Sequence, residues 1–292
     1  MNRLIWLPLM LLRLITYLPI RWQYSVGRII GKFIYYTASE LRQISATNLA
    51  LCFPEKSPQE RKSLLKKNFA ALGMGVIETA MAWWLSDKRL ADCQINLTGL
   101  DYVEAAFKKG NGILLLGPHF MCLELVGRLL GARYAFAVLY RPHKKKWLAQ
   151  IQENFRQKYR IEQIPKNNMR KLIRTLKNNT AVWYAYDIDA GEKKSVFAPF
   201  FGIQTASLTT ASRLISMTDT TILPIRFYRR EETWGYDIHI DKPLADFPTP
   251  SVLEDATKLN QTLEAAIRYK PEQYIWQYKR FKTRPFGEKR FY

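Results

Sequence analysis

A histidine and a glutamate lie five positions apart in an otherwise apolar stretch, and together they could perform base catalysis. His119 and Glu124 belong to GILLLGPHFMCLELVGRLLG, residues 112 to 131. A charged group in apolar surroundings is costly unless it is paired or used. If residues 119 to 124 are helical, Glu124 can accept a hydrogen bond from the imidazole and raise its basicity. His119 could then remove a proton from an alcohol or a thiol.

The same residues also allow other interpretations. Glu124 could pair with Arg128 at the i+4 position as an ordinary helix ion pair. Cys122 could be a thiolate nucleophile activated by His119, or a small apolar helix residue, which is the commoner role of a free cysteine. A six-residue motif is weak evidence for a site. The residues alone therefore leave catalysis and structure both open.

The position of His119 favours a site. The run GILLLGP is typical of a strand buried on both faces, Pro118 stiffens the turn that follows, and a helix begins within a few residues. Ligand sites in open α/β sheets gather at such strand ends. The free N–H groups of a helix N-terminus can also stabilise a developing negative charge.

Strand and helix patterns alternate along the remaining chain. Helical periodicity covers residues 40 to 90, and further helices are expected at 101–112, in the basic stretch after 142, at about 207–218 and at 252–268. The Phe-rich FAPFFG is interpreted as a loop. The alternation predicts one α/β domain with a mostly parallel or mixed central sheet flanked by helices. Strands are predicted at 94–100, 112–118, 133–142, 180–189, 221–229 and 234–241.

The N-terminus combines an apolar segment, LIWLPLMLLRLITYLPI, with an aromatic and basic one. Trp and Tyr favour the membrane–water interface, and the basic residues suit anionic headgroups on the cytoplasmic side. We therefore expect an N-terminal membrane-anchoring helix over residues 1–35, followed by a single domain over 36–292. Whether the anchor spans the bilayer or lies in the interface is left open, and a helix folded into the core is the alternative.

Composition excludes several classes of protein. The three cysteines and three histidines form no CxxC or HExxH pattern, and the sequence has no Walker loop and no GxGxxG turn. We therefore expect no metal and no diffusible cofactor. The formal net charge of +20 attracts polyanions without choosing among them. No stacking platform, zinc finger or recognition-helix pattern supports a nucleic-acid partner.

Five blocks in order resemble one family over nearly the whole chain. The sequence is similar to the lipid A late acyltransferases, the lauroyl/myristoyl transferases of the HtrB/LpxL type, within the H-x4-[DE] glycerolipid acyltransferase group. Tyr186 and Ile188 depart from the Pro-Asp-Gln-Asp usual in the fourth block, whereas Asp187 and Asp189 persist. The blocks are RQISATNLALCFPE, GPHFMCLE, YRPHKK with NFRQKY, YAYDIDAGEKKSVFAPFFGIQTASLT and QYIWQYKRFKTRPFGE.

The resemblance implies a glycerolipid acyltransferase-like fold and a membrane-bound O-acyltransferase. The donor would be an acyl carrier protein thioester, and the acceptor a hydroxyacyl chain of a lipid A precursor. The place would be the cytoplasmic face of the bacterial inner membrane, an anionic surface. Another glycolipid or a glycerophospholipid is the alternative acceptor.

The resemblance also implies roles for five residues. His119, oriented by Glu124, would be the base, and Arg156 with backbone N–H groups would stabilise the oxyanion. Arg156 and Arg213 would bind substrate phosphates, since Arg grips phosphate with two hydrogen bonds. Asp187 is assigned to the substrate-binding region as a loop-organising carboxylate rather than as a second base.

The densest positive charge lies between Tyr140 and Asn179, a stretch that contains twelve Lys or Arg residues and two acidic residues. This stretch could hold the phosphates of the acceptor or dock the acidic carrier protein. The alternative is a solvated helix face beside anionic lipid.

Overall fold

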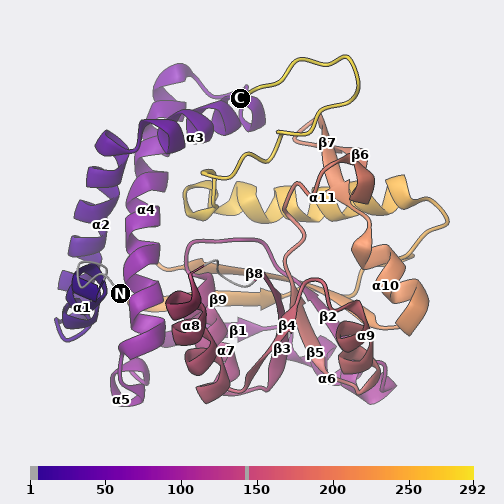
Figure 1. The fold of residues 1–292 in the computed structure, drawn as a ribbon, viewed down its shortest axis with the longest axis horizontal. Coiled ribbons are helices and arrows are strands. Elements are labelled where there is room, and N and C mark those ends of the chain that lie inside the picture. The colour runs from indigo at the N-terminus through magenta and orange to yellow at the C-terminus, as the bar shows by residue number, and fades with distance from the viewer. Residues whose placement is uncertain (1–5, 142–144) are drawn as a thin grey trace.

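The computed structural model describes residues 6–141 and 145–292, which fold around a seven-stranded sheet (Figure 1). Every neighbouring pair of strands is parallel except β8 and β9, so the sheet is mixed. The predicted α/β class is confirmed. In sheet order the strands are β1 (Gln94–Thr98), β9 (Gly235–Ile240), β8 (Thr221–Arg229), β2 (Ile113–Leu116), β5 (Ala181–Tyr184), β3 (Phe136–Tyr140) and β4 (Ile161–Pro165).

The centre of the sheet is the most deeply buried part. All four residues of β2 and all four of β5 are buried, as expected for central parallel strands with helices on both faces. Their sequences, ILLL and AVWY, carry no charged residue that would require a partner. Helices flanking the sheet are α6 (Leu100–Lys109), α7 (Leu123–Gly131), α8 (Lys146–Lys158), α9 (Met169–Lys177), α10 (Thr210–Thr218) and α11 (Val252–Tyr269).

The N-terminal helices lie side by side at one end of the molecule (Figure 1). The longest, α4, begins at a capping box in which Ser57 and Glu60 satisfy each other's backbone N–H groups, with Pro58 as its first residue. The group consists of α1 (Trp6–Ile15), α2 (Ile20–Thr37), α3 (Ser39–Cys52), α4 (Pro58–Trp84) and the short α5 (Asp87–Leu90).

Glycines allow α2 and α4 to touch along their backbones. A Cβ added to Gly73 of α4 would lie 2.1 Å from the Gly27 carbonyl oxygen and 2.3 Å from the Gly31 nitrogen, both in α2. Such distances are far inside van der Waals contact, so a larger residue at Gly73 would push the two helices apart. The position of α2 is therefore fixed by close backbone packing.

The described part of the predicted membrane anchor forms helices with an apolar exterior. Within the described part of the chain, no helix is both long and apolar enough to cross a bilayer. Large apolar side chains are nevertheless exposed along α1 and α2: Leu7, Met10, Leu11, Leu14, Tyr17, Leu18, Trp22, Ile29, Phe33 and Tyr36.

Three strands were absent from the sequence prediction. The segment FAPFFG, expected to be a loop, lies mostly in β6 (Ser195–Phe200), which pairs with β7 (Ile203–Leu208) as an antiparallel hairpin. The helix expected from about 207 begins only at Thr210. The third is β4, which interrupts the expected basic helical stretch between α8 and α9.

Candidate active site

His119 and Asp187 occupy equivalent positions beyond two neighbouring strands. The last residues of β2 and β5, Leu116 and Tyr184, are paired in register, and each site residue follows three positions later. Because the strands are parallel, both loops emerge at the same edge of the sheet. Topology therefore joins two residues that are 68 positions apart in the sequence.

The imidazole of His119 is held by the buried carboxylate of Asp187. Nδ1 lies 2.6 Å from Asp187 Oδ1, and the backbone N–H of His119 donates to Asp187 Oδ2 at 2.8 Å. The His119 side chain is 36% exposed and that of Asp187 only 1%. The carboxylate thus fixes the ring from behind, and the imidazole retains an accessible side.

Electrostatics at this pair favour a charged imidazole beside a charged carboxylate. Burial lowers the pKa of His119, but the charge and hydrogen bond of Asp187 raise it more, so the pKa lies above its ordinary value. Burial raises the pKa of Asp187, whereas His119 and a hydrogen bond from Tyr274 lower it below its ordinary value. Burial and the Asp187 charge raise the pKa of Tyr274 far above its ordinary value, so its hydroxyl remains a donor.

Glu124 has partners other than the expected imidazole. Its Oε1 accepts hydrogen bonds from Arg156 Nη2 at 2.8 Å and from Gln152 Nε2 at 2.9 Å, both on α8. Among the hydrogen bonds of the described residues, none joins Glu124 to His119. The expectation that Glu124 holds the ring is corrected, since Asp187 makes that contact. The reason is local: α7 begins only at Leu123, so His119 lies in a turn and helical spacing does not apply.

Arg128 is engaged elsewhere too, although it was considered as a partner for Glu124. Its guanidinium is fully buried and binds the carbonyl oxygens of Met81 and Ala82 and the carboxylate of Asp87. Arg128 therefore ties α7 to the end of α4. Glu124 and Arg156, with side-chain exposures of 19% and 12%, form a separate ion pair.

Cys122 is a buried residue at the start of α7. It is fully buried, and burial together with the charge of Glu78 raises the pKa of its thiol far above its ordinary value. A thiolate nucleophile therefore has no support here. Cys122 has the packing role that was its alternative interpretation.

The role of organising the loop after β5 belongs to Asp189. Its carboxylate accepts from the backbone N–H and the hydroxyl of Thr283, and from the N–H of Gly191. Asp187, assigned that role from the sequence, faces His119 instead. Sequence reasoning chose Asp187 for this role and gave Asp189 none, because nothing local distinguishes the two aspartates.

Arg213 and Arg156 do not share a site. Arg213 is exposed on α10, whereas α8, which carries Arg156, lies over a different part of the sheet (Figure 1). Besides Glu124, the Arg156 guanidinium contacts Gln163 at 3.4 Å and lies over the Tyr140 ring. Only Arg156 is held in a defined orientation by side chains around it.

A partly exposed histidine backed by a buried carboxylate, at the carboxyl edge of a mainly parallel sheet, has the geometry that a general base requires. Enzymes with such a site remove a proton from a hydroxyl so that its oxygen can attack a carbonyl carbon. The comparisons with known proteins agree with this class. Residues 1–283 match the model of the bacterial lipid A biosynthesis acyltransferases, and the chain belongs to that family.

Three relatives show how far the similarity extends. The chain is 34% identical to the lipid A biosynthesis palmitoleoyltransferase of Escherichia coli K12, over 99% of this chain and 94% of that protein. It is 34% identical to the lauroyltransferase of the same strain, over 97% and 93%, and 22% identical to the myristoyltransferase, over 97% and 88%. These names carry three different acyl groups, so similarity does not choose among them.

Proposed function

We propose that this protein transfers a fatty acyl chain from acyl carrier protein to a lipid A precursor. The acceptor is the hydroxyl group of a hydroxyacyl chain on that precursor. The observation that carries the proposal is the pair of His119 and Asp187 at the end of β2, with the ring partly exposed and the carboxylate buried. The family supports acyl transfer in lipid A biosynthesis. The carrier-protein donor and the membrane-bound state are part of the proposal.

The pair of His119 and Asp187 supplies the proton transfers. With Nδ1–H donating to Asp187, the lone pair on Nε2 accepts the proton of the acceptor hydroxyl. The hydroxyl oxygen forms a bond to the thioester carbon, and the carbonyl oxygen becomes an oxyanion. When the tetrahedral intermediate collapses, the carbon–sulfur bond breaks, and the imidazolium returns its proton to the leaving thiolate. Nothing is oxidised or reduced.

Positive charge near the carbonyl would stabilise the oxyanion. Our candidates are Arg156, held by Glu124 and Gln152, and backbone N–H groups at the start of α7. Glu124 is then a positioning residue for Arg156. Its loss should weaken substrate binding and oxyanion stabilisation more than it affects the base itself.

An apolar cavity supports a hydrocarbon substrate. It has a volume of about 50 Å³ and lies between α6, the start of β3 and the central strands. We propose that it receives part of the acyl chain, because alkyl groups gain free energy when removed from water. The lining side chains include Leu115, Trp183, Ile225, Val103 and Phe107.

The exposed face of α1 and α2 supports attachment in the plane of a membrane. The first 39 residues contain no acid, and Arg13, Arg21, Arg28 and Lys32 are exposed beside the ten apolar side chains named above. An amphipathic surface with cations only is suited to an anionic bilayer interface. We therefore propose the cytoplasmic face of the bacterial inner membrane as the location.

The basic residues of α9, with Lys158 at the end of α8, suit the acidic carrier protein. Lys158, Arg170, Arg174 and Lys177 are exposed, and Lys158 contacts Asp87 only at 3.9 Å. Opposite charges on the partners would steer the acylated carrier toward α9, which carries Arg170, Arg174 and Lys177. The phosphates of the acceptor are the other anions that this surface could bind.

The test is an assay of acyl transfer from acyl carrier protein with purified His119→Ala and His239→Ala variants. His239 is the matched control, because its ring is on β9 and pairs with Thr98. We expect about a 10²–10⁴-fold loss for the first variant and little change for the second. Near-wild-type turnover of folded His119→Ala would exclude this mechanism. Mass spectrometry of lipids from a deletion strain tests the acceptor, since the proposal requires lipid A lacking one acyl chain.

A further inference from the structure

The turn that carries His119 is held by a segment from the far end of the chain. The N–H of Met121 donates to the carbonyl oxygen of Gln273 at 2.9 Å, and the N–H of Ile275 donates to that of His119 at 3.2 Å. These two bonds surround an isolated antiparallel bridge. The turn lies outside the named strands, so its backbone depends on this contact for its position.

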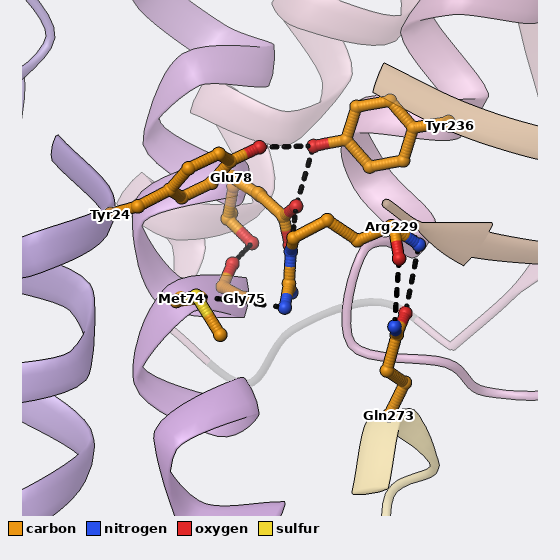
Figure 2. Close-up of polar contacts among 8 residues, drawn as sticks. Tyr24, Met74, Gly75, Glu78, Arg229, Tyr236 and Gln273 are labelled. Carbon is orange, nitrogen blue, oxygen red and sulfur yellow. Dashed lines mark hydrogen bonds and ion pairs between the residues drawn. The ribbon is translucent and has the colours of Figure 1, made fainter. Parts of the chain in front are cut away.

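Gln273 also binds the end of a central strand through its side chain (Figure 2). Its Oε1 accepts from the backbone N–H of Arg229 at 2.8 Å, and its Nε2 donates to the Arg229 carbonyl oxygen at 2.9 Å. Arg229 is the last residue of β8, and Gln273 is only 3% exposed. The side-chain amide therefore satisfies the end of β8 as a neighbouring strand would.

Arg229 is in turn fixed by a buried polar network. Its guanidinium binds both carboxylate oxygens of Glu78 on α4, at 2.6 and 2.7 Å. The hydroxyl of Tyr236 donates to the same carboxylate and lies 2.9 Å from the hydroxyl of Tyr24 on α2 (Figure 2). A buried ion pair with its hydrogen bonds satisfied holds one geometry, since any shift leaves a charge unpaired.

A second anchor acts on the segment from α4. The buried amide of Asn68 donates to the carbonyl oxygens of Glu272 at 2.9 Å and Tyr274 at 2.7 Å. Tyr274 also acts on the site, because its hydroxyl lowers the pKa of Asp187. The residues on both sides of Gln273 are thus held in place by Asn68. A shift of this segment would move Tyr274 relative to the carboxylate of Asp187, which holds His119.

We propose that Gln273 is a positioning residue for the base: its side chain ties the end of β8 to the segment whose backbone holds the His119 turn. The inference rests on the proposed function in that His119 is the base. Gln273 acts through Met121 and Tyr274 and does not touch the reacting atoms. A displacement of about 1 Å at the base is enough to cost about 10²-fold in rate.

The test compares Gln273→Met and Gln273→Glu with Gln23→Met. Methionine keeps the length of the side chain without the two hydrogen bonds, and glutamate places an oxygen against the Arg229 carbonyl oxygen. Gln23 on α2 is the matched control, because its buried amide also donates to backbone carbonyl oxygens, those of Thr16 and Leu18, and no hydrogen bond of the described residues joins it to Arg229 or to the catalytic turn. We expect kcat to fall about 10- to 100-fold in the Gln273 variants, with KM within about twofold, and to stay within about threefold in the control.

A readout independent of turnover is the titration of the imidazole by nitrogen NMR. His119 is one of three histidines, so its ring signals can be assigned by comparison with His119→Ala. We expect the Gln273 variants to change the titration midpoint of His119 or its tautomer. A folded Gln273 variant with wild-type kcat and wild-type titration would refute the inference, as would an equal loss of kcat in Gln23→Met. The titration needs no substrate, so it remains decisive even if His119→Ala proves active and the proposed reaction is wrong.

Discussion

Replacing Asp187 by asparagine should invert the tautomer of His119. The two carboxylate oxygens now accept from the His119 backbone N–H and from Nδ1–H. An asparagine has one acceptor and one donor. If its oxygen stays on the backbone N–H, its NH2 group faces Nδ1, which must then be the acceptor. The ring proton moves to Nε2, the atom that should take the proton of the acceptor hydroxyl.

The expected loss is large because the wrong tautomer cannot act as a base. In a serine-protease triad the same replacement costs about 10⁴-fold in kcat. At 1.36 kcal/mol for each factor of ten, this is about 5 kcal/mol of barrier.

Glu124→Gln, in contrast, keeps an oxygen for Arg156 and Gln152 and loses only the charge. We expect about a tenfold loss there, mainly in KM, since a hydrogen bond to a charged group exceeds a neutral one by about 1 kcal/mol.

The assay is steady-state acyl transfer with both substrates varied, between pH 5 and 9. Because Asp187 raises the pKa of His119, the rise of kcat/KM with pH should be centred above the ordinary value for histidine. Residual activity of Asp187→Asn should rise at lower pH than in the wild type, since the charge that favours the protonated ring is gone. A 10⁴-fold loss in Glu124→Gln with a mild effect of Asp187→Asn would refute our reasoning and restore Glu124 as the orienting acid.

Three further predictions concern packing and docking. Gly73→Ala should destabilise the protein by about 1–3 kcal/mol in denaturant unfolding, because the added Cβ meets the α2 backbone. Gly127→Ala is the control: its Cβ meets nothing within 4 Å, so this variant should be more stable by up to about 1 kcal/mol. Glu78→Gln should cost about 3–5 kcal/mol in the same measurement, because it leaves the buried guanidinium on β8 without a counter-charge, and an unchanged unfolding midpoint would contradict the buried network. The Arg170→Glu, Arg174→Glu double variant should raise the KM for acylated carrier protein about tenfold at low salt with kcat unchanged, and a KM that stays constant would exclude this surface as the docking site.

The fold was largely predictable where burial dictates the sequence. The runs ILLL and AVWY are apolar because β2 and β5 are covered on both faces, and both were predicted as strands. The hairpin of β6 and β7 was missed for the opposite reason. It contains Pro199, and proline weakens a strand prediction; among the described strands β6 and β7 pair only with each other. In β4, IEQIP follows a basic helix so closely that local pattern alone does not reveal the break.

The site was predictable only in part. His119 was predicted as a site residue because it follows a buried strand, and this prediction requires no knowledge of the strand order. Its partner depends on which strand lies next to β2, and strand order is a property of the whole fold. One signal was available: Asp187 follows AVWY at the same offset at which His119 follows ILLL. If two such apolar runs form parallel neighbouring strands, the polar residues that follow them at equal offsets lie next to each other.

The spacing between His119 and Glu124 is a property of a turn followed by a helix. Cys122, with φ −86° and ψ 9°, is the residue before α7, so only Glu124 of the pair is helical and it projects toward α8. The motif therefore brings two functions to one strand end: a base on the turn, and a carboxylate in the first helical turn that fixes a cation. Because the base is served by Asp187 and the cation by Glu124, the two carboxylates should have separable effects. Loss of Asp187 acts on proton transfer and its pH dependence, and loss of Glu124 acts on the charge that Arg156 offers to the substrate.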